Sequence, residues 1–420
     1  MAVKNAHGLV PRHAEHAVSA ALADTRVVLI NGVRQAGKST LARTIVATRP
    51  DAKIQLLDVA EVRNAANADP SGFVQHEGLL VLDEVQRVPE LLLAIKAVVD
   101  EDSRPGQYLL TGSSRLLGRR DIPDALPGRM ETITLWPFTQ GELDRQPDRF
   151  IDAVFTHGPE LSVTSELKRQ DYAERVVRGG YPEAIKRNEL ARRRRFFADY
   201  LNDLIDREVR ELSDIEYAAR VRQLMRMLAA RTASPLILSP LASDLGVTQP
   251  TVRHYVDLLE QVYLIRRIPA WSRNLTARAT ATPKVVVADS GLASHLVGQS
   301  PDRLAEPDGA LGPLLEAFVA MELIKQLAWS DEMVDVYHFR TRDQVEVDLV
   351  LESAAGDVIG IEVKSTVTAR SEDFRGLRYL SDRIGSRFLC GILLHAGTQT
   401  LPFGPKLRAM PVSAVWTAEP

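Results

Sequence analysis

A glycine-rich segment directly after an apolar run constrains the fold of this 420-residue chain more than any other feature. The segment Gly32–Ser39 fits the pattern G-x-x-x-x-G-K-[ST], and it stands between the apolar run Val27–Ile30 and a helical stretch, Thr40–Thr48. Glycines let backbone N–H groups converge on phosphate oxygens, and the helix start adds a partial positive charge. The sequence therefore predicts a strand, a phosphate-binding loop and a helix that hold ATP or GTP.

Two side chains of this loop have specific expected roles. Lys38 should reach the β- and γ-phosphates during phosphoryl transfer, and Ser39 should ligate Mg²⁺. The residues expected to surround the nucleotide are Gly32, Val33, Arg34, Gln35, Ala36, Gly37, Lys38, Ser39 and Thr40.

Two adjacent acids follow the apolar run Leu79–Leu82, about 45 residues after the loop. We expect Asp83 to hold the Mg²⁺ shell through water, and Glu84 to polarise the attacking water. On their own such acids are also typical of a solvated strand end. Their spacing from the phosphate-binding loop favours a catalytic site.

Two further residues are candidates for sensing the γ-phosphate. Thr111 ends the next apolar run, Tyr108–Leu110, and precedes Gly112–Ser114, where a plain turn is the alternative. Arg129 precedes the run Ile133–Leu135 and could reach the γ-phosphate of a neighbouring subunit, which would make the protein a homo-oligomer. An ordinary surface arginine or a salt bridge at a helix end is the alternative.

The sequence pattern divides the chain into four segments. Short apolar runs alternate with helical stretches in the first, which predicts a buried parallel sheet with helical crossovers. Charged helices follow, then a compact helical unit, and then a second α/β region with period-2 patterning. The expected domains are residues 1–143, a P-loop ATPase core; 144–212, a helical lid or linker; 213–283, a winged helix-turn-helix; and 284–420, a second α/β domain.

The third segment contains the signals of a helix-turn-helix. Ser239–Gly246 reads as a short helix that a glycine stops, and Thr248 caps a second helix, Gln249–Gln261, before a wing-like strand at Tyr263–Ile268. If DNA binds, the residues facing the major groove would be Gln249, Arg253 and His254. A packing or protein-docking module is the alternative. The run Arg192–Arg195 is either a solvated helix face or a stripe of phosphate contacts.

Acids on two adjacent strands mark the last segment. Val345–Leu351 and Ile359–Lys364 alternate polar and apolar residues around a turn, which predicts a hairpin. Asp348 and Glu362 could hold a second Mg²⁺ or Mn²⁺, with Glu316 on the preceding helix as a third ligand. Lys364 beside that metal could activate a water for attack on a phosphodiester. A polar sheet face with an ordinary ion pair is the alternative.

Taken together, these motifs resemble a prokaryotic family of ATP-binding proteins, in which an AAA+ ATPase domain precedes a C-terminal domain of unknown function. The motifs that carry the resemblance are Gly32–Ser39, Leu82–Gln86, Leu110–Ser114, Pro127–Arg129, Arg178–Glu183, Ala288–Leu292, Glu346–Asp348 and Ile361–Lys364. Two positions depart from the usual family pattern, because Val33 stands where proline is common and Ser39 where threonine is. Neither departure threatens nucleotide binding.

The resemblance also implies the fold and activity of the whole chain. It implies an AAA+ ATPase that binds and hydrolyses ATP, and, through Glu316, Asp348 and Glu362, a C-terminal domain similar to the PD-(D/E)xK, or restriction-endonuclease-like, nuclease core. DNA is the expected macromolecular partner. A regulator or scaffold whose nuclease-like domain binds nucleic acid without cutting is the alternative.

The amino-acid composition mainly excludes certain kinds of site and protein. The formal charge of −3 gives no whole-molecule argument for nucleic acid, so any such site must be a local patch. No run approaches the ~20 apolar residues of a membrane span. The single cysteine, Cys390, lies in an apolar run and cannot form an intramolecular disulfide, which fits a cytoplasmic location.

Overall fold

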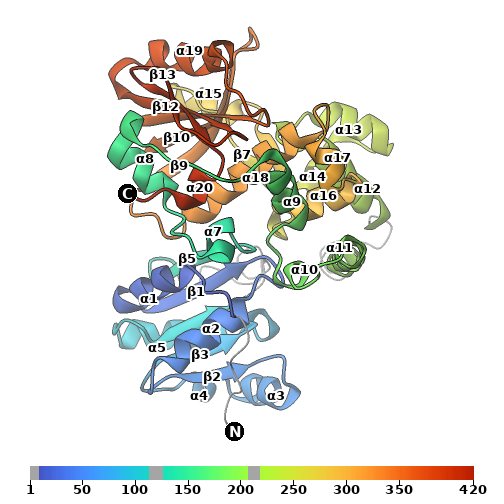
Figure 1. Cartoon of the computed structure of the whole chain (residues 1–420). Helices are drawn as coiled ribbons and strands as arrows, with labels where there is room; N and C mark the ends of the chain where they lie inside the picture. Colours follow the sequence, from blue (N-terminus) through green and yellow to red (C-terminus); the bar gives the residue numbers. More distant parts are fainter. Residues whose placement is uncertain (1–8, 113–125, 207–217) are drawn as a thin grey trace. The chain divides into compact units, whose positions relative to one another are not determined.

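The computed structural model describes residues 9–112, 126–206 and 218–420 (Figure 1). The chain divides into two compact units, Met1–Phe138 and Thr139–Pro420. Ser113 and Ser114, which follow the predicted γ-phosphate sensor, lie outside the described residues. Within the described ranges, none of the helices combines the length and the apolar character that crossing a bilayer requires.

The first unit is built on a five-stranded parallel sheet in the order β2-β3-β4-β1-β5. This confirms the parallel α/β fold predicted from the alternating apolar runs. Strand β3, at whose end the acids lie, does not pair with β1, at whose end the P-loop begins. Strand β4 lies between these two strands. The strands are β1 (Val27–Gly32), β2 (Lys53–Leu56), β3 (Leu80–Asp83), β4 (Tyr108–Thr111) and β5 (Met130–Leu135).

Helices bury both faces of this sheet. Val27 and Leu29 of β1 pack into a core cluster with Ile95 and Val99 of α5, while the alternate residues of β1 are also buried. Packing on both faces fixes the edge where the strands end, and the P-loop and the acids follow there. The helices of this unit are α1 (Ala14–Asp24), α2 (Lys38–Ala47), α3 (Ala60–Ala68), α4 (Pro70–Phe73), the 3₁₀ turn η1 (Val85–Arg87) and α5 (Leu91–Glu101).

The second unit begins with helices. They are α7 (Gln140–Asp144), α8 (Phe150–His157), η2 (Gly158–Glu160), α9 (Arg169–Arg178), α10 (Pro182–Ile185), α11 (Leu190–Leu204), α12 (Ala218–Ala230), α13 (Leu238–Leu245), α14 (Gln249–Gln261), α15 (Leu275–Thr280), α16 (Ser290–Leu296), α17 (Pro301–Ala305) and α18 (Leu311–Gln326). A small antiparallel sheet, in the order β6-β8-β7, joins this group; its strands are β6 (Ser234–Pro235), β7 (Ile265–Ile268) and β8 (Lys284–Val287).

The helix pair α13–α14 has the predicted turn, with Gly246 in the left-handed conformation at φ 64°. Thr248 caps α14 by accepting a hydrogen bond from the N–H of Thr251, as expected. The first helix begins at Leu238 instead of at the predicted Ser239, and Pro240 is tolerated because it still lies in the first turn. The following strand is also shorter than predicted, because Tyr263 adopts a positive φ of 58° before it.

A six-stranded mixed sheet ends the chain, in the order β13-β14-β12-β11-β10-β9. The predicted hairpin is confirmed, because β10 and β11 pair antiparallel with Leu351 opposite Ile359. Helix α18 packs against β11, and α19 packs against β10, β11 and β12. The remaining elements are β9 (Val334–Arg340), β10 (Glu346–Ser353), β11 (Val358–Lys364), η5 (Ser371–Phe374), α19 (Arg375–Ile384), η6 (Gly385–Arg387), β12 (Phe388–His395), β13 (Leu401–Gly404), β14 (Leu407–Pro411) and α20 (Ala414–Thr417).

Candidate nucleotide site and a buried acid cluster

The P-loop runs from the end of β1 to the start of α2 and needs glycine at both ends. Gly32 has φ 127°, and a Cβ there would lie 2.2 Å from the carbonyl oxygen of Leu135 on β5. Gly37 has φ 101° and caps α2. The first glycine is therefore required by the packing of β1 against β5, while the second is required by the backbone conformation that starts the helix.

Lys38 is 5% exposed, and its ammonium group points back into the loop. Its Nζ donates to the carbonyl oxygens of Gly32 at 3.0 Å and Val33 at 2.9 Å. The charge is thus held at the centre of the loop, where the backbone N–H groups at the start of α2 also carry partial positive charge. This arrangement suits a polyphosphate.

Arg12 contacts the same loop, although no sequence motif pointed to this residue. Its guanidinium donates to the carbonyl oxygens of Ala36 and Trp136, both at 2.7 Å, and lies 4.8 Å from the ring centre of Phe138. The partners are 24 and 124 residues away in sequence. Arg12 therefore ties the P-loop to the segment after β5.

The acids at the end of β3 are organised by Thr111, at the end of the neighbouring strand β4. Its fully buried hydroxyl donates to Asp83 Oδ1 at 2.5 Å and accepts the backbone N–H of Glu84 at 3.0 Å. Glu84 has a positive φ of 61°, and its carboxylate accepts a hydrogen bond from Gln86. Thr111 thus connects the two acids, and Gln86 is a further partner that sequence reasoning missed.

The oxygens available here suit Mg²⁺. Ser39 lies in the first turn of α2, directly after Lys38, and Asp83 ends β3 with one carboxylate oxygen bound to Thr111. Hydroxyl and carboxylate oxygens are the ligand types that this ion takes in P-loop sites. The residues present therefore fit the metal.

Arg129 lies at the other end of the sheet. Its carbonyl oxygen accepts the N–H of Val27, at the start of β1, whereas the P-loop follows the end of β1. Its side chain pairs with Asp100, and this interaction lowers the pKa of that carboxyl. Arg129 is therefore placed away from the phosphate loop of its own chain, and its ion pair with Asp100 in the last turn of α5 is the helix-end salt bridge of the alternative interpretation.

The predicted C-terminal acids lie close together, but a lysine stands between two of them. Lys284, at the start of β8, is 3% exposed and donates to Glu316 Oε1 of α18 at 2.6 Å. The same ammonium is 3.4 Å from Asp348 Oδ1 on β10. Sequence reasoning missed Lys284, because it lies 32 and 64 residues away from these acids.

The other members of the cluster are also bonded. Asp348 accepts the backbone N–H of Val363 at 2.9 Å, and Lys364 donates to Glu362 Oε1 at 2.7 Å. The β9–β10 register shifts between Val347 and Val350, so Asp348 sits in a β-bulge. Because the bulge interrupts the period-2 pattern of β10, that pattern alone does not predict which face of the sheet Asp348 lies on.

Burial governs protonation in this cluster. Burial and the nearby carboxylate of Asp348 raise the pKa of Glu316 to about 8 and that of Glu362 to about 7. Burial alone would lower the pKa of Lys284, but Glu316 and Asp348 raise it above its ordinary value. The lysine therefore stays charged, and it is the cation on which these acids depend.

Among the described residues, no group of three or more His, Cys, Asp or Glu side chains is arranged to hold a metal ion. The expected second Mg²⁺ or Mn²⁺ at Glu316, Asp348 and Glu362 thus lacks a ligand set of this kind. Glu362 Oε2 is buried, and it has no hydrogen-bond partner in the part of the chain that the structure describes. The physical reason for the disagreement is the ammonium of Lys284 between two of the expected ligands.

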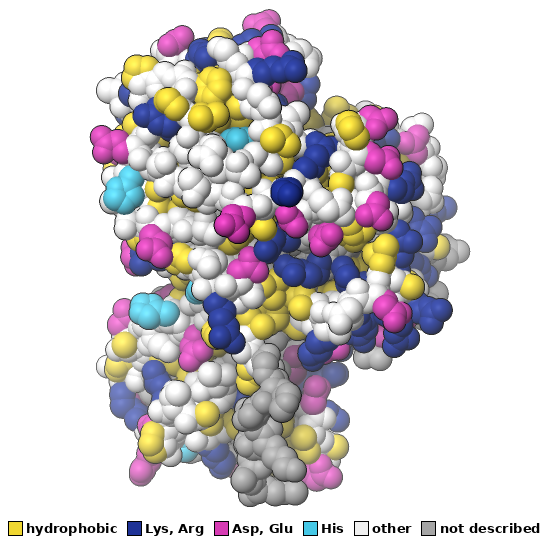
Figure 2. Space-filling model, viewed as in Figure 1, with side chains coloured by type: hydrophobic (Ala, Val, Ile, Leu, Met, Phe, Trp, Pro, Cys, Tyr) yellow, Lys and Arg dark blue, Asp and Glu magenta, His cyan; other side chains and the backbone are white. Residues whose placement is uncertain are grey.

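The expected DNA-facing residues are exposed. Gln249, Arg253 and His254 all lie on the solvent side of α14, while Val252 and Tyr255 are buried. Figure 2 shows Lys and Arg side chains, interspersed with Asp and Glu, over the part of this unit that contains α9 to α12. This part of the surface therefore carries many basic side chains, but acidic side chains lie among them.

The arginine run at 192–195 is not a single solvated stripe. Arg192 and Arg195 are exposed, but Arg193 donates to the carbonyl oxygens of Arg187 and Asn188, and Arg194 donates to that of Gln299. The inner pair of arginines therefore ties α11 to neighbouring backbone.

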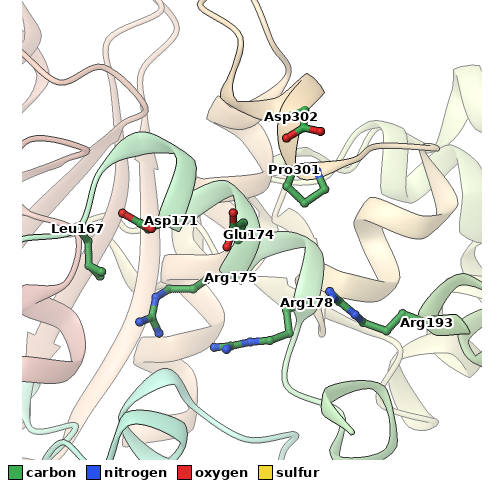
Figure 3. A pocket seen from close by; sticks show the side chains of 8 residues that line it. All are labelled: Leu167, Asp171, Glu174, Arg175, Arg178, Arg193, Pro301 and Asp302. Atoms are coloured by element: carbon green, nitrogen blue, oxygen red, sulfur yellow. The ribbon is translucent and has the colours of Figure 1, made fainter. Parts of the chain in front are cut away.

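A pocket of about 330 Å³ lies beside Arg193 (Figure 3). Arg175 and Arg178 extend from α9, and both donate to Gln140 Oε1. Arg175 also pairs with Asp144 at 2.8 Å, and burial lowers the pKa of Arg178. Because acids also line it, the pocket has mixed charge; they are Asp171, Glu174 and Asp302.

Two motifs of the sequence resemblance meet in a packing junction. Asp289 caps α16 through the N–H of Leu292 and also accepts the N–H of Gly180 at 2.7 Å. A Cβ on Gly179 would lie 2.4 Å from Asp289 Oδ1, and one on Gly291 would lie 2.9 Å from the carbonyl oxygen of Arg178. The structure thus gives both glycine motifs a role in close backbone approach.

Comparison with known proteins supports the first unit most strongly. Residues 24–144 match the family model described as an AAA domain. Residues 169–303 and 311–415 match two domains of unknown function, DUF8612 and DUF4143.

Relatives along the whole chain carry no described activity. A protein of Mycobacterium bovis and one of Mycobacterium tuberculosis, both described as uncharacterized, are each 28% identical over 399 residues, which cover 93% of this chain and 81% of the relative. A Walker-type ATPase of Pyrococcus abyssi is similar in structure, with 18% identity, a TM-score of 0.42 and coverage of 69% of this chain and 96% of that chain. That score does not establish a shared fold.

The family match and the P-loop geometry agree on the same residues. The match spans β1 to β5, which includes Lys38, Asp83, Glu84 and Thr111. Residues 24–144 therefore form an AAA-type ATPase domain, which is followed by regions matching two families of unknown function.

Proposed function

We propose that this protein is a Mg²⁺-dependent AAA+ ATPase whose nucleotide state controls a DNA-binding, nuclease-like second unit. The observation that carries the proposal is the hydroxyl of Thr111, which holds Asp83 and the backbone of Glu84 together at the end of the sheet where the P-loop begins. Catalysis of phosphoryl transfer depends on such fixed positions, because the protein mainly positions groups and stabilises charge.

Each residue of the site has one role in hydrolysis. The ammonium of Lys38 stabilises negative charge on the transferred phosphoryl group, and the carboxylate of Glu84 orients the attacking water and accepts its proton. Ser39 and Asp83 hold Mg²⁺, which supplies further neutralisation of phosphate charge. Hydrolysis then removes the γ-phosphate that distinguishes the two nucleotide states.

The DNA-binding part of the proposal rests on the second unit. Residues 213–283 act as a winged helix-turn-helix, in which α14 enters the major groove and presents Gln249, Arg253 and His254. Its support is the exposure of these side chains beside the buried face of α14. Residues 144–212 act as the helical lid or linker, and residues 284–420 form the nuclease-like domain.

The variant Glu84→Gln tests the link between nucleotide and DNA. It keeps the site's shape but removes the general base, so ATP should bind while turnover falls about 10²- to 10⁴-fold. Fluorescence anisotropy with labelled duplex DNA should then give different affinities with ATP and with ADP. Equal DNA affinities in the two nucleotide states would refute the switch, although not ATP turnover.

Arg253→Ala locates the DNA contact. It should weaken duplex binding and make the affinity less sensitive to salt, because one charge contact is lost. Arg303→Ala, which removes an exposed arginine on α17, is the matched control and should leave the affinity close to wild type. Equal effects of the two variants would exclude α14 as the recognition element.

A further inference from the structure

We propose that Lys284 is a built-in cation that takes the place of a divalent metal ion between Glu316 and Asp348. The nuclease-like domain would then hold its acids together without a metal, and it would bind nucleic acid without cleaving it. The inference rests on the proposed nuclease-like fold of residues 284–420, but it does not depend on ATP turnover.

The geometry gives the ammonium the contacts expected of a bound cation. Its Nζ lies 2.6 Å from a carboxylate oxygen of Glu316 and 3.4 Å from one of Asp348, with the side chain almost fully buried. A buried charge at this depth is tolerated only with opposite charges and hydrogen bonds around it. The buried charge of Lys284 is therefore stabilised by both acids, and the lysine in turn stabilises their buried carboxylates.

The position of Lys284 in the fold makes this contact a junction. It begins β8 of the three-stranded sheet, whereas Glu316 lies on α18 and Asp348 on β10. One ammonium group thus joins three elements, one of which belongs to the sheet beside the proposed recognition helices. A metal ion at this point would connect only the acids.

Charge counting argues against a metal in addition to the lysine. Two ammonium groups already lie among the three acids, because Lys284 contacts Glu316 and Asp348 and Lys364 is paired with Glu362 at 2.7 Å. A divalent ion would have to enter against two positive charges. Lys284 and Lys364 contact one oxygen of each of these acids, and the second oxygen of Asp348 accepts the N–H of Val363, so few carboxylate oxygens are left to build a ligand set for Mg²⁺.

Mn²⁺ binding without nucleotide tests this directly. Electron paramagnetic resonance should give the same number of bound Mn²⁺ ions for wild type and for Asp348→Asn. Lys284→Met, which keeps the length and removes the charge, should gain one Mn²⁺ site that disappears when Asp348→Asn is added. Asp348-dependent Mn²⁺ binding by wild type would overturn the proposal, and so would a folded Lys284→Met without an added site.

Stability provides a second measurement in case Lys284→Met folds poorly. Removing the ammonium leaves buried acids unpaired, so the melting temperature should fall, and Lys284→Met/Glu316→Gln should recover most of the loss. Lys325→Met is the matched control, because Lys325 is an equally buried lysine paired with Glu322 on the same helix as Glu316. Its loss should not be recovered by Glu316→Gln. A double variant as unstable as Lys284→Met overturns the proposal.

Measuring ATP turnover separates this inference from the proposed ATPase function. Lys284 lies outside the ATPase domain, so ATP hydrolysis by the wild type tests the proposed function whatever the Mn²⁺ experiment shows. The inference also predicts that wild-type protein with Mn²⁺ leaves linear and supercoiled DNA intact, and cleavage lost in Asp348→Asn would overturn it.

Discussion

At the residue scale, the hydroxyl of Thr111 accounts for the geometry of the hydrolytic acids. It is a donor to Asp83 and an acceptor for the N–H of Glu84, which adopts an unusual positive φ. A non-glycine residue in this conformation usually costs free energy and is held by its surroundings. Thr111 is therefore a positioning residue for both acids, in addition to its predicted role towards the γ-phosphate.

Thr111→Val should separate positioning from nucleotide binding. The β-branched shape is kept, but both hydrogen bonds are lost, so kcat should fall about 10- to 100-fold, with ATP affinity within a few-fold of wild type. Thr111→Ser, which restores the hydroxyl, should recover most of the turnover. Steady-state kinetics and nucleotide titration measure both quantities. A serine variant as slow as the valine variant would show that only packing matters at this position.

Individual residues also show which parts of the sites could be predicted from the sequence. Lys38, Asp83 and Glu84 lie in local motifs next to apolar runs, so their spacing alone brings them to one sheet edge. Lys284 and Arg12 have no such motif, because their partners come from distant segments. A buried lysine becomes recognisable only when the acids around it are placed in space.

At the element scale, close backbone approach explains several glycines. Gly179 has φ 66°, and its missing Cβ leaves room for the carboxylate of Asp289, which binds the next residue's N–H and caps α16. This junction holds the end of α9 against α16. It connects two motifs that are 109 residues apart, and their sequences alone do not show that they touch.

Gly179→Ala should destabilise the second unit more than a backbone effect alone. Gly179 has φ 66° and ψ −163°, a region that is essentially restricted to glycine, so alanine there costs about 1–3 kcal/mol, and the added Cβ would also collide with Asp289. Gly385→Ala is the matched control, since Gly385 has a similar backbone conformation, with φ 74° and ψ −128°, and no described atom within 4 Å of the added Cβ. Chemical denaturation should give a larger loss for Gly179→Ala. Equal losses of unfolding free energy in the two variants would show that the contact between Gly179 and Asp289 adds nothing to the backbone effect.

At the scale of the whole molecule, the parallel sheet and the P-loop were predictable because they arise from local patterns, whereas the relations between distant segments were not. The predicted domain limits at 143, 212 and 283 remain predictions. The described chain divides after Phe138, within the link between β5 and α7. Periodicity identifies elements, but it does not show which of them share a core.

Arg129 bears on assembly. If it completes the site of a neighbouring subunit, Arg129→Ala should lower turnover by about 10³-fold or more. A mixture of Arg129→Ala with Lys38→Ala should then regain part of the activity, because one subunit supplies an intact P-loop and the other an intact arginine. The control is Asp100→Ala, which removes the ion-pair partner that Arg129 shares with Lys96 but keeps the arginine, and it should stay active. No recovery in the mixture would indicate that Arg129 has no role in a neighbour's site.

The most direct test of the central claim is phosphate release from ATP with Mg²⁺ by wild type and Lys38→Ala, with Lys96→Ala as a control for a partly exposed lysine of the same domain. Lys38 supplies the buried positive charge of the P-loop, so its removal should abolish turnover while Lys96→Ala stays close to wild type. Wild-type turnover in Lys38→Ala would contradict the assignment of this loop as the ATP site.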